Sequence, residues 1–174
     1  MMSENELLNS AREIIYTWRN LDSGCGAVSL FHHANGRHYL IFCTEMYGYS
    51  VLEIESGRDF HYIPSQAHPQ RAEDFDETFI WCDASYHSKN NLLAVDGCFW
   101  ACPYSVLLVD FTDPLREQPA ESWIDIHTEL DPDYERYGHL DFDHWDENGD
   151  LHLKIDEKDD LCVSAEQVKN WLRR

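Results

Sequence analysis

The chain has 174 residues, of which 43% are hydrophobic and 13% aromatic, so it is not intrinsically disordered and can bury a core without disulfide bonds. Its 33 acidic and 13 basic residues give a net charge of −20, which repels nucleic acids and anionic membrane surfaces. The start has no signal-peptide pattern, and no apolar run approaches the roughly 18 residues of a membrane-spanning helix, so we expect a cytoplasmic protein.

A single domain over residues 1–174 is expected, because chains of about 100–200 residues usually form one domain and no linker-like stretch interrupts this one. Near its start, Ser3 and Glu6 match the capping box that precedes many helices. Apolar residues follow at helical spacing as far as Trp18. These features predict a helix over residues 4–19.

The next segment, GAVSLFHHANGRHYLIFC, predicts a β-hairpin. Its two apolar runs flank Asn35 and Gly36, the dipeptide that best satisfies the two positive φ angles of a two-residue turn. Counting outward from that turn places His33 opposite His38 and leaves apolar residues on both faces of the hairpin. We therefore expect this hairpin inside a sheet that is covered on both sides.

An internal repeat relates two parts of the chain at an offset of 55 residues. The matched elements are His32 with His87, Asn35 with Asn90, Cys43 with Cys98, and two YSVL segments. We expect repeat units over residues 26–64 and 78–127, and a partial third unit over residues 138–158. The pattern predicts a mainly β fold of antiparallel sheets, packed as a sandwich or a partial propeller, with a helix at each terminus.

The segment NNLLAVDGCFWACPYSVLLVDFTDP resembles uncharacterised small bacterial proteins with propeller-blade-like β repeats. The resemblance covers about residues 78–114 well and residues 26–64 more loosely, and it lacks the Trp-Asp and Gly-His signatures of WD repeats. It implies a β-rich repeat fold and no particular activity. A closed propeller needs roughly four to eight blades, so we expect these few units to pack face to face or to be completed by a second copy of the chain.

Six cysteines, at positions 25, 43, 82, 98, 102 and 162, are expected to be reduced thiols that serve packing. Cys98 and Cys102 lie four residues apart, but the other four cysteines, at positions 25, 43, 82 and 162, are scattered singly, so no second cysteine pair accompanies them. The chain also lacks the common nucleophile and phosphate-loop motifs. We therefore expect no catalytic residue, no metal site and no cofactor.

The hairpin around Asn148 and Gly149 differs from the first, because apolar residues alternate with acidic and other polar ones. One face should be apolar and the other wet. The residues expected on the wet face include Asp141, Asp143, Trp145 and Asp156. After this hairpin, Ser164 and Gln167 form a second capping box, which predicts a helix over residues 164–173.

Residues 110–160 contain 18 acidic and four basic residues, so this segment alone carries a net charge of −14. Such charge without a catalytic motif predicts a non-catalytic binding factor, immunity-like or regulatory, that presents a negative face to a basic protein. Its expected contact residues are Asp141, Asp143, Asp156 and Trp145. A further interpretation is an acidic surface that only maintains solubility and has no partner.

The alternative function is an enzyme or small-ligand binder with a pocket between the β repeats, where histidine and aromatic side chains would converge. The residues expected in that pocket are His32, His87, Trp81, Trp100 and Tyr104. A deep polar pocket lined by several of them would favour this function, and a flat acidic face would favour the binding factor.

Overall fold

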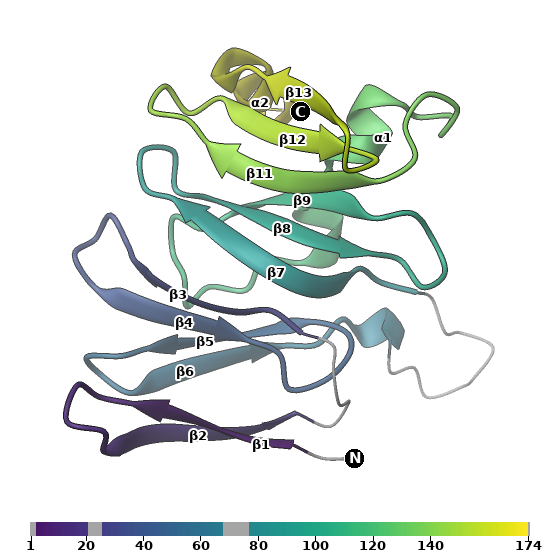
Figure 1. Ribbon diagram of the computed structural model, residues 1–174. Helices are drawn as coiled ribbons and strands as arrows, with labels where there is room; N and C mark the ends of the chain where they lie inside the picture. Colours follow the sequence, from purple (N-terminus) through teal and green to yellow (C-terminus); the bar gives the residue numbers. More distant parts are fainter. Residues whose placement is uncertain (1–2, 21–25, 68–76, 174) are drawn as a thin grey trace.

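The computed structural model describes residues 3–20, 26–67 and 77–173. These residues form four antiparallel sheets stacked in layers, so the prediction of a mainly β fold is confirmed (Figure 1). The strands are β1 (Ser3–Leu8), β2 (Ile14–Asn20), β3 (Val28–His32), β4 (His38–Phe42), β5 (Tyr49–Glu53), β6 (Arg58–Tyr62), β7 (Ile80–His87), β8 (Leu92–Cys98), β9 (Ser105–Asp110), β10 (Ile124–Asp125), β11 (Leu140–Trp145), β12 (Leu151–Ile155) and β13 (Asp159–Val163). The helices are η1 (Ser65–Ala67), η3 (Ala120–Ser122), α1 (Ile126–Leu130) and α2 (Ala165–Trp171). None of these described helices has the length and apolar character needed to span a membrane.

The layers follow the order of the sequence. The hairpin β1–β2 covers the sheet β3–β4–β5–β6, and this sheet packs on the sheet β7–β8–β9–β10. The strands β11–β12–β13 and helix α2 cover the other face of the β7–β10 sheet. The strands β3, β4 and β5 reappear as β7, β8 and β9 at the repeat offset of 55 residues, whereas β6 has no counterpart at that offset.

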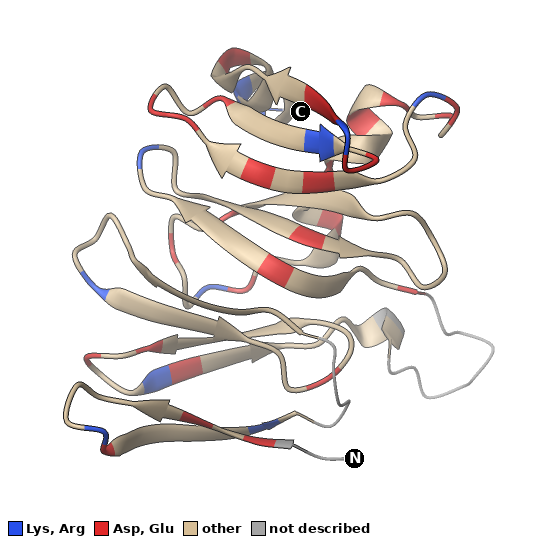
Figure 2. Ribbon diagram, in the orientation of Figure 1, with Lys and Arg blue, Asp and Glu red and all other residues tan. Residues whose placement is uncertain are grey.

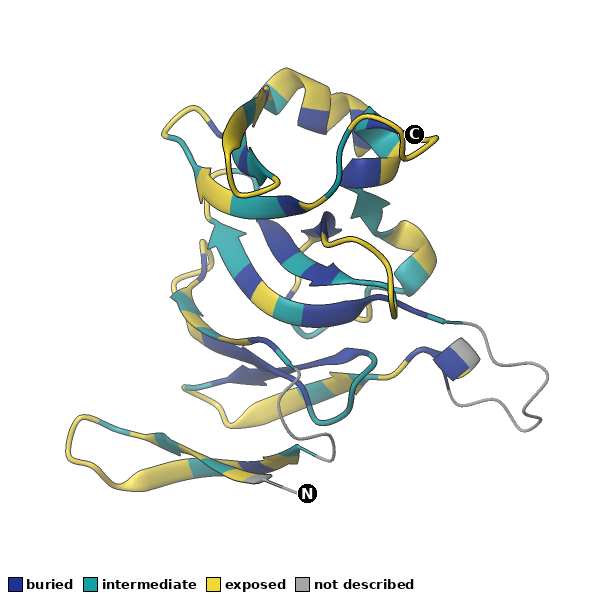
Figure 3. Cartoon of the chain, turned by 45° about the vertical axis from the view of Figure 1, so that its right-hand side comes forward, coloured by how far each residue is buried: buried dark blue, intermediate teal, exposed yellow. Residues whose placement is uncertain are grey.

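The β7–β10 sheet is buried on both faces, which explains the unbroken apolar runs in β8 and β9. Leu93 and Val95 point into the core shared with the β3–β6 sheet, and Leu92 and Ala94 point into the core shared with β11–β13. Successive side chains of a strand point to opposite faces, so a strand between two cores needs apolar residues at every position. In Figure 3 buried residues gather on the central sheet and on the neighbouring β3–β6 sheet, whereas the β1–β2 hairpin is largely exposed or intermediate.

The helix predicted over residues 4–19 is wrong, because this segment forms the hairpin β1–β2. The run Ile14–Trp18 consists of β-branched and aromatic residues, which favour a strand. At the turn, the Asn9 side chain accepts hydrogen bonds from the backbone N–H groups of Ala11 and Glu13, both at 2.9 Å. Apolar side chains of the hairpin cover the outer face of the β3–β6 sheet, and this tertiary contact outweighs the local capping pattern. The predicted C-terminal helix is present as α2, and Ser164 caps it.

The register predicted for the first Asn-Gly hairpin is also wrong, because His38 pairs with His32 and not with His33. The loop contains three residues, 34–36, and the pair His33–Arg37 closes it through a backbone hydrogen bond of 2.8 Å. Only Gly36 has a positive φ, of 85°, as in a type I turn that ends in a glycine bulge. A shift of one residue moves every side chain of β3 to the other face, so Phe31 packs against the core.

Replacing Gly36 with valine is expected to lower the free energy of unfolding by about 1–3 kcal/mol. No atom would lie within 4 Å of an added Cβ, so the cost comes from forcing a β-branched residue to adopt a positive φ. Gly36→Asn is the matched control, because asparagine tolerates this backbone conformation and should lose much less. Thermal or urea unfolding measures both, and a valine variant as stable as the asparagine variant would show that the turn has another conformation.

Candidate functional site

Two residues of the predicted ligand pocket lie on opposite faces of the β7–β10 sheet. Trp81 is fully buried in the core shared with the β3–β6 sheet, where its ring stacks on Tyr49 at a centroid distance of 4.5 Å. His87 stacks at 5.1 Å on Trp145, which packs against the core on the other side of the sheet. These two side chains therefore serve two different interfaces between layers.

The other three predicted pocket residues lie elsewhere. His32 is exposed on the outer face of the β3–β6 sheet beside His38, at a ring distance of 4.9 Å. Trp100 is 59% exposed in the turn after β8, and Tyr104 lies before β9 near His139. The structure thus does not bring the five residues together, because Trp81 and His87 face opposite sides of the β7–β10 sheet, His32 lies on another sheet, and the other two residues lie in loops.

Of the four residues expected on the wet face of the last hairpin, Trp145 packs against a core instead. A β-bulge between Phe142 and His144 shifts the register of β11, so that Trp145 pairs with Leu151 and packs against the core. Asp143 and Asp156 are exposed as predicted, and Asp141 is half-buried. A hollow of about 380 Å³ is lined by Tyr104, His139, Asp141, Asp156 and Glu157.

No disulfide bond joins two cysteines of the described residues, and these cysteines are spread over the fold. Cys43 is buried in the core beside the β3–β6 sheet, whereas Cys102 is exposed in the turn after β8. The pKa of the Cys162 thiol is raised, mainly by burial and to a lesser extent by the negative charges of Asp150 and Asp146. The raised pKa disfavours the thiolate, which is the nucleophilic form of cysteine. Within residues 3–20, 26–67 and 77–173, no three His, Cys, Asp or Glu side chains form a group that could hold a metal ion. Cys25 lies outside these ranges.

Acidic residues are most frequent on the strands and helices of the last two layers (Figure 2). Two of them, Asp83 and Asp96, lie directly opposite each other on β7 and β8. Asp96 Oδ1 accepts a hydrogen bond of 2.7 Å from the backbone N–H of Phe142, which joins β8 to β11. Burial raises the pKa of Asp96 to about 7, against the effect of this hydrogen bond and with the help of the Asp141 and Asp83 charges.

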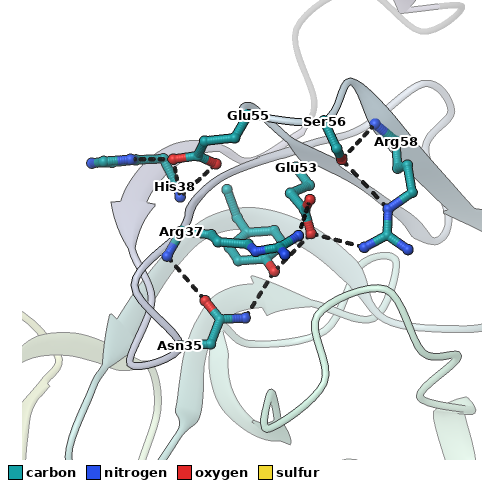
Figure 4. Close-up of polar contacts among 8 residues, drawn as sticks. Asn35, Arg37, His38, Glu53, Glu55, Ser56 and Arg58 are labelled. Atoms are coloured by element: carbon teal, nitrogen blue, oxygen red, sulfur yellow. Dashed lines mark hydrogen bonds and ion pairs between the residues drawn. The ribbon is translucent and has the colours of Figure 1, made fainter.

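A basic cluster lies at the end of the β3–β6 sheet, around the buried carboxylate of Glu53 (Figure 4). Arg58 Nη2 contacts Glu53 Oε2 at 3.0 Å, the Tyr39 hydroxyl donates to the same oxygen, and Arg37 pairs with Oε1. The Ser56 hydroxyl, Arg58, Tyr39 and Arg37 lower the pKa of Glu53 to about 2. Both arginines are therefore bound to a buried carboxylate, and the cluster is structural.

A cavity of about 740 Å³ is a groove formed by β10, α1 and the C-terminal end of α2, with the adjoining ends of β8 and β9. Its carboxylates are Asp110, Glu121, Asp125 and Glu129, and its apolar residues are Leu92, Trp123, Ile124, Trp171 and Leu172. No Lys, Arg or His of the described chain lines it. We call this surface the acidic groove. It combines negative charge with apolar area, which suits the aliphatic stem and charged head of Lys or Arg.

Several contacts fix the walls of the acidic groove. Asp125 caps helix α1, because it accepts hydrogen bonds from the His127 N–H at 3.0 Å and the Thr128 hydroxyl at 2.7 Å. The Trp123 indole N–H donates to the Gln118 carbonyl at 3.0 Å, while its ring packs edge-on against Trp81 at 5.5 Å. These carboxylate and indole groups are held before any ligand arrives, which reduces the entropic cost of binding.

Comparison of the chain with models of known protein families, with curated proteins and with solved structures finds no match. No relative therefore assigns a role to the residues described above. The charge and shape of the acidic groove are the observations from which a function can be inferred.

Proposed function

We propose that the protein is a non-catalytic binding factor, immunity-like or regulatory, whose acidic groove receives a basic and partly apolar segment of another protein. The observation that carries the proposal is a groove with four carboxylates, an apolar floor and, in the described chain, no basic lining residue. A charge of −20 over the whole chain would also accelerate the encounter with a basic partner.

Binding in the groove would use two kinds of contact. The stems of Lys or Arg side chains would lie on Trp123 and Leu172, and their charged heads would reach Glu121 and Glu129 at the rim. Exposed charges are screened over about 8 Å at 0.15 M salt, so association should slow as ionic strength rises. The apolar contacts should persist at high salt and keep a residual affinity.

An amphipathic peptide of arginine and leucine residues serves as the probe, with a citrulline peptide of the same length as its uncharged control. The triple variant Asp110→Asn, Glu121→Gln, Glu129→Gln is expected to weaken peptide binding about tenfold or more. Asp125 is left unchanged because it caps helix α1. Calorimetry or anisotropy at several salt concentrations measures the affinity.

The matched control is Asp141→Asn, Asp143→Asn, Asp156→Asn, which removes the same number of charges from the acidic face predicted from the sequence. It should change the affinity by less than about twofold. Equal losses in the two triple variants would mean that total charge, and not the groove, binds the peptide. The absence of any binding at low salt would leave an acidic surface without a partner.

A further inference from the structure

A second cavity, of about 210 Å³, adjoins the acidic groove and shares Glu121, Trp123 and Asp125 with it. We call it the aromatic cavity, because Phe79, Phe99 and the indole of Trp123 form much of its wall. Phe79 and Phe99 meet edge-to-face at 5.4 Å. Such walls offer π-electron density to a cation, which is attracted to the face of an aromatic ring.

The polar groups of the aromatic cavity are acidic or neutral. Glu77 uses Oε1 to accept a hydrogen bond from the backbone N–H of Trp100, and the structure gives its other oxygen no such bond within the described chain. Glu121 is exposed at the junction with the acidic groove, whereas the oxygens of Asp125 already accept several hydrogen bonds. No Lys, Arg or His among the described residues lines the cavity.

Thr78 adds an observation that is independent of charge. It is only 6% exposed, and its hydroxyl has no hydrogen-bond partner among the described residues. A buried hydroxyl without a partner is costly, so a native structure calls for an explanation of it. Thr78 lines the aromatic cavity, where a ligand N–H group would satisfy it.

We infer that the aromatic cavity binds a guanidinium group, and that the occupant is an arginine side chain of the segment lying in the acidic groove. The inference rests on the proposed function for the source of the arginine. A guanidinium group is planar, stacks on aromatic rings and carries five N–H donors. Its donors would reach the carboxylates of Glu77 and Glu121 and the Thr78 hydroxyl, while Phe99 and Trp123 hold its faces.

Arginine amide is the probe for this site, because it needs no partner protein. Citrulline amide has nearly the same shape without the side-chain charge, and lysine amide has the side-chain charge without the planar group. We expect arginine amide to shift the NMR signal of the Trp123 indole N–H and to bind about tenfold more tightly than either control. Equal binding of the three amides, or no binding of arginine amide at millimolar concentration, would overturn the inference.

Single-residue variants test whether arginine amide binds in the aromatic cavity. Phe99→Leu keeps an apolar side chain but removes a π face, and Glu121→Gln removes a charge at an exposed position, so each should weaken arginine amide binding several-fold. Asp110→Asn alters only the acidic groove and should leave this binding unchanged. If wild type and Phe99→Leu bind the arginine–leucine peptide equally well, the guanidinium site in the aromatic cavity is refuted but the proposed function is not. Binding of arginine amide without binding of any basic peptide would refute the proposed function alone.

Discussion

Replacing Arg37 and Arg58 together with methionine is expected to lower the free energy of unfolding by about 3 kcal/mol. Glu53 is only 1% exposed, and these two guanidinium groups are its counter-charges. Methionine retains much of the apolar stem of arginine, so the variant mainly removes charge. The large effect arises because an unpaired buried carboxylate remains, and not because two exposed arginines are lost.

A third substitution tests this explanation. Glu53→Gln in the double variant should recover most of the stability at neutral pH, because it removes the buried charge. In the wild type, the pKa of Glu53 is lowered from 4.5 to about 2, so its stabilising effect is complete above pH 4.5 and is lost as the pH falls toward 2. Urea unfolding at several pH values measures both effects. A triple variant as unstable as the double variant would refute the role assigned to Glu53.

Replacing Asp96 with asparagine is expected to raise the free energy of unfolding at pH 8 by about 2–4 kcal/mol. The charged carboxylate of Asp96 is disfavoured by burial and by the acidic side chains of Asp141 and Asp83. An asparagine side chain has no charge, and its carbonyl oxygen can still accept the hydrogen bond from Phe142. The stabilisation should therefore come without loss of the link between β8 and β11.

The pH dependence of the Asp96 variant has a definite sign. A pKa raised from 3.8 to about 7 means that the folded protein binds more protons than the unfolded chain between these values, so wild-type stability falls as the pH rises through this range. The free energy of unfolding of the Asp96→Asn variant should not show this fall with rising pH. The raised pKa of Asp141 has the same sign and leaves a smaller slope in the variant. Parallel stability curves for wild type and variant between pH 4 and pH 8 would contradict the prediction.

The sequence predicted the mainly β fold correctly because apolar residues dominate β4, β5, β8 and β9, whichever core they face. The sequence did not predict the register of two strand pairs, because a shift of one residue is enough to change which side chains face the core. In the first hairpin a positive φ at Gly36 alone produces a three-residue loop, and in the last one a bulge after Phe142 turns Trp145 inward. Neither choice can be read from alternation of apolar and polar residues.

The acidic groove was only partly predictable. Its carboxylates belong to the acidic segment 110–160, which the charge count identified. Its apolar floor, however, comes from Leu92, Trp123 and Trp171, which lie far apart in the sequence and meet only through the layer order and helix α2. The aromatic cavity gave no signal in the sequence, because its aromatic residues read as ordinary core positions.

The most direct test of the acidic groove is an NMR titration with the arginine–leucine peptide, observed at the indole N–H signals of the tryptophans. Trp123 and Trp171 line the groove, whereas Trp100 is 59% exposed and Trp145 lies near the other acidic face. The groove predicts that the Trp123 and Trp171 signals shift saturably with the peptide, that the citrulline peptide leaves them in place, and that Trp100 and Trp145 do not respond. Shifts confined to Trp145 and Trp100, or equal small shifts at these four of the six tryptophans, would contradict binding in the groove.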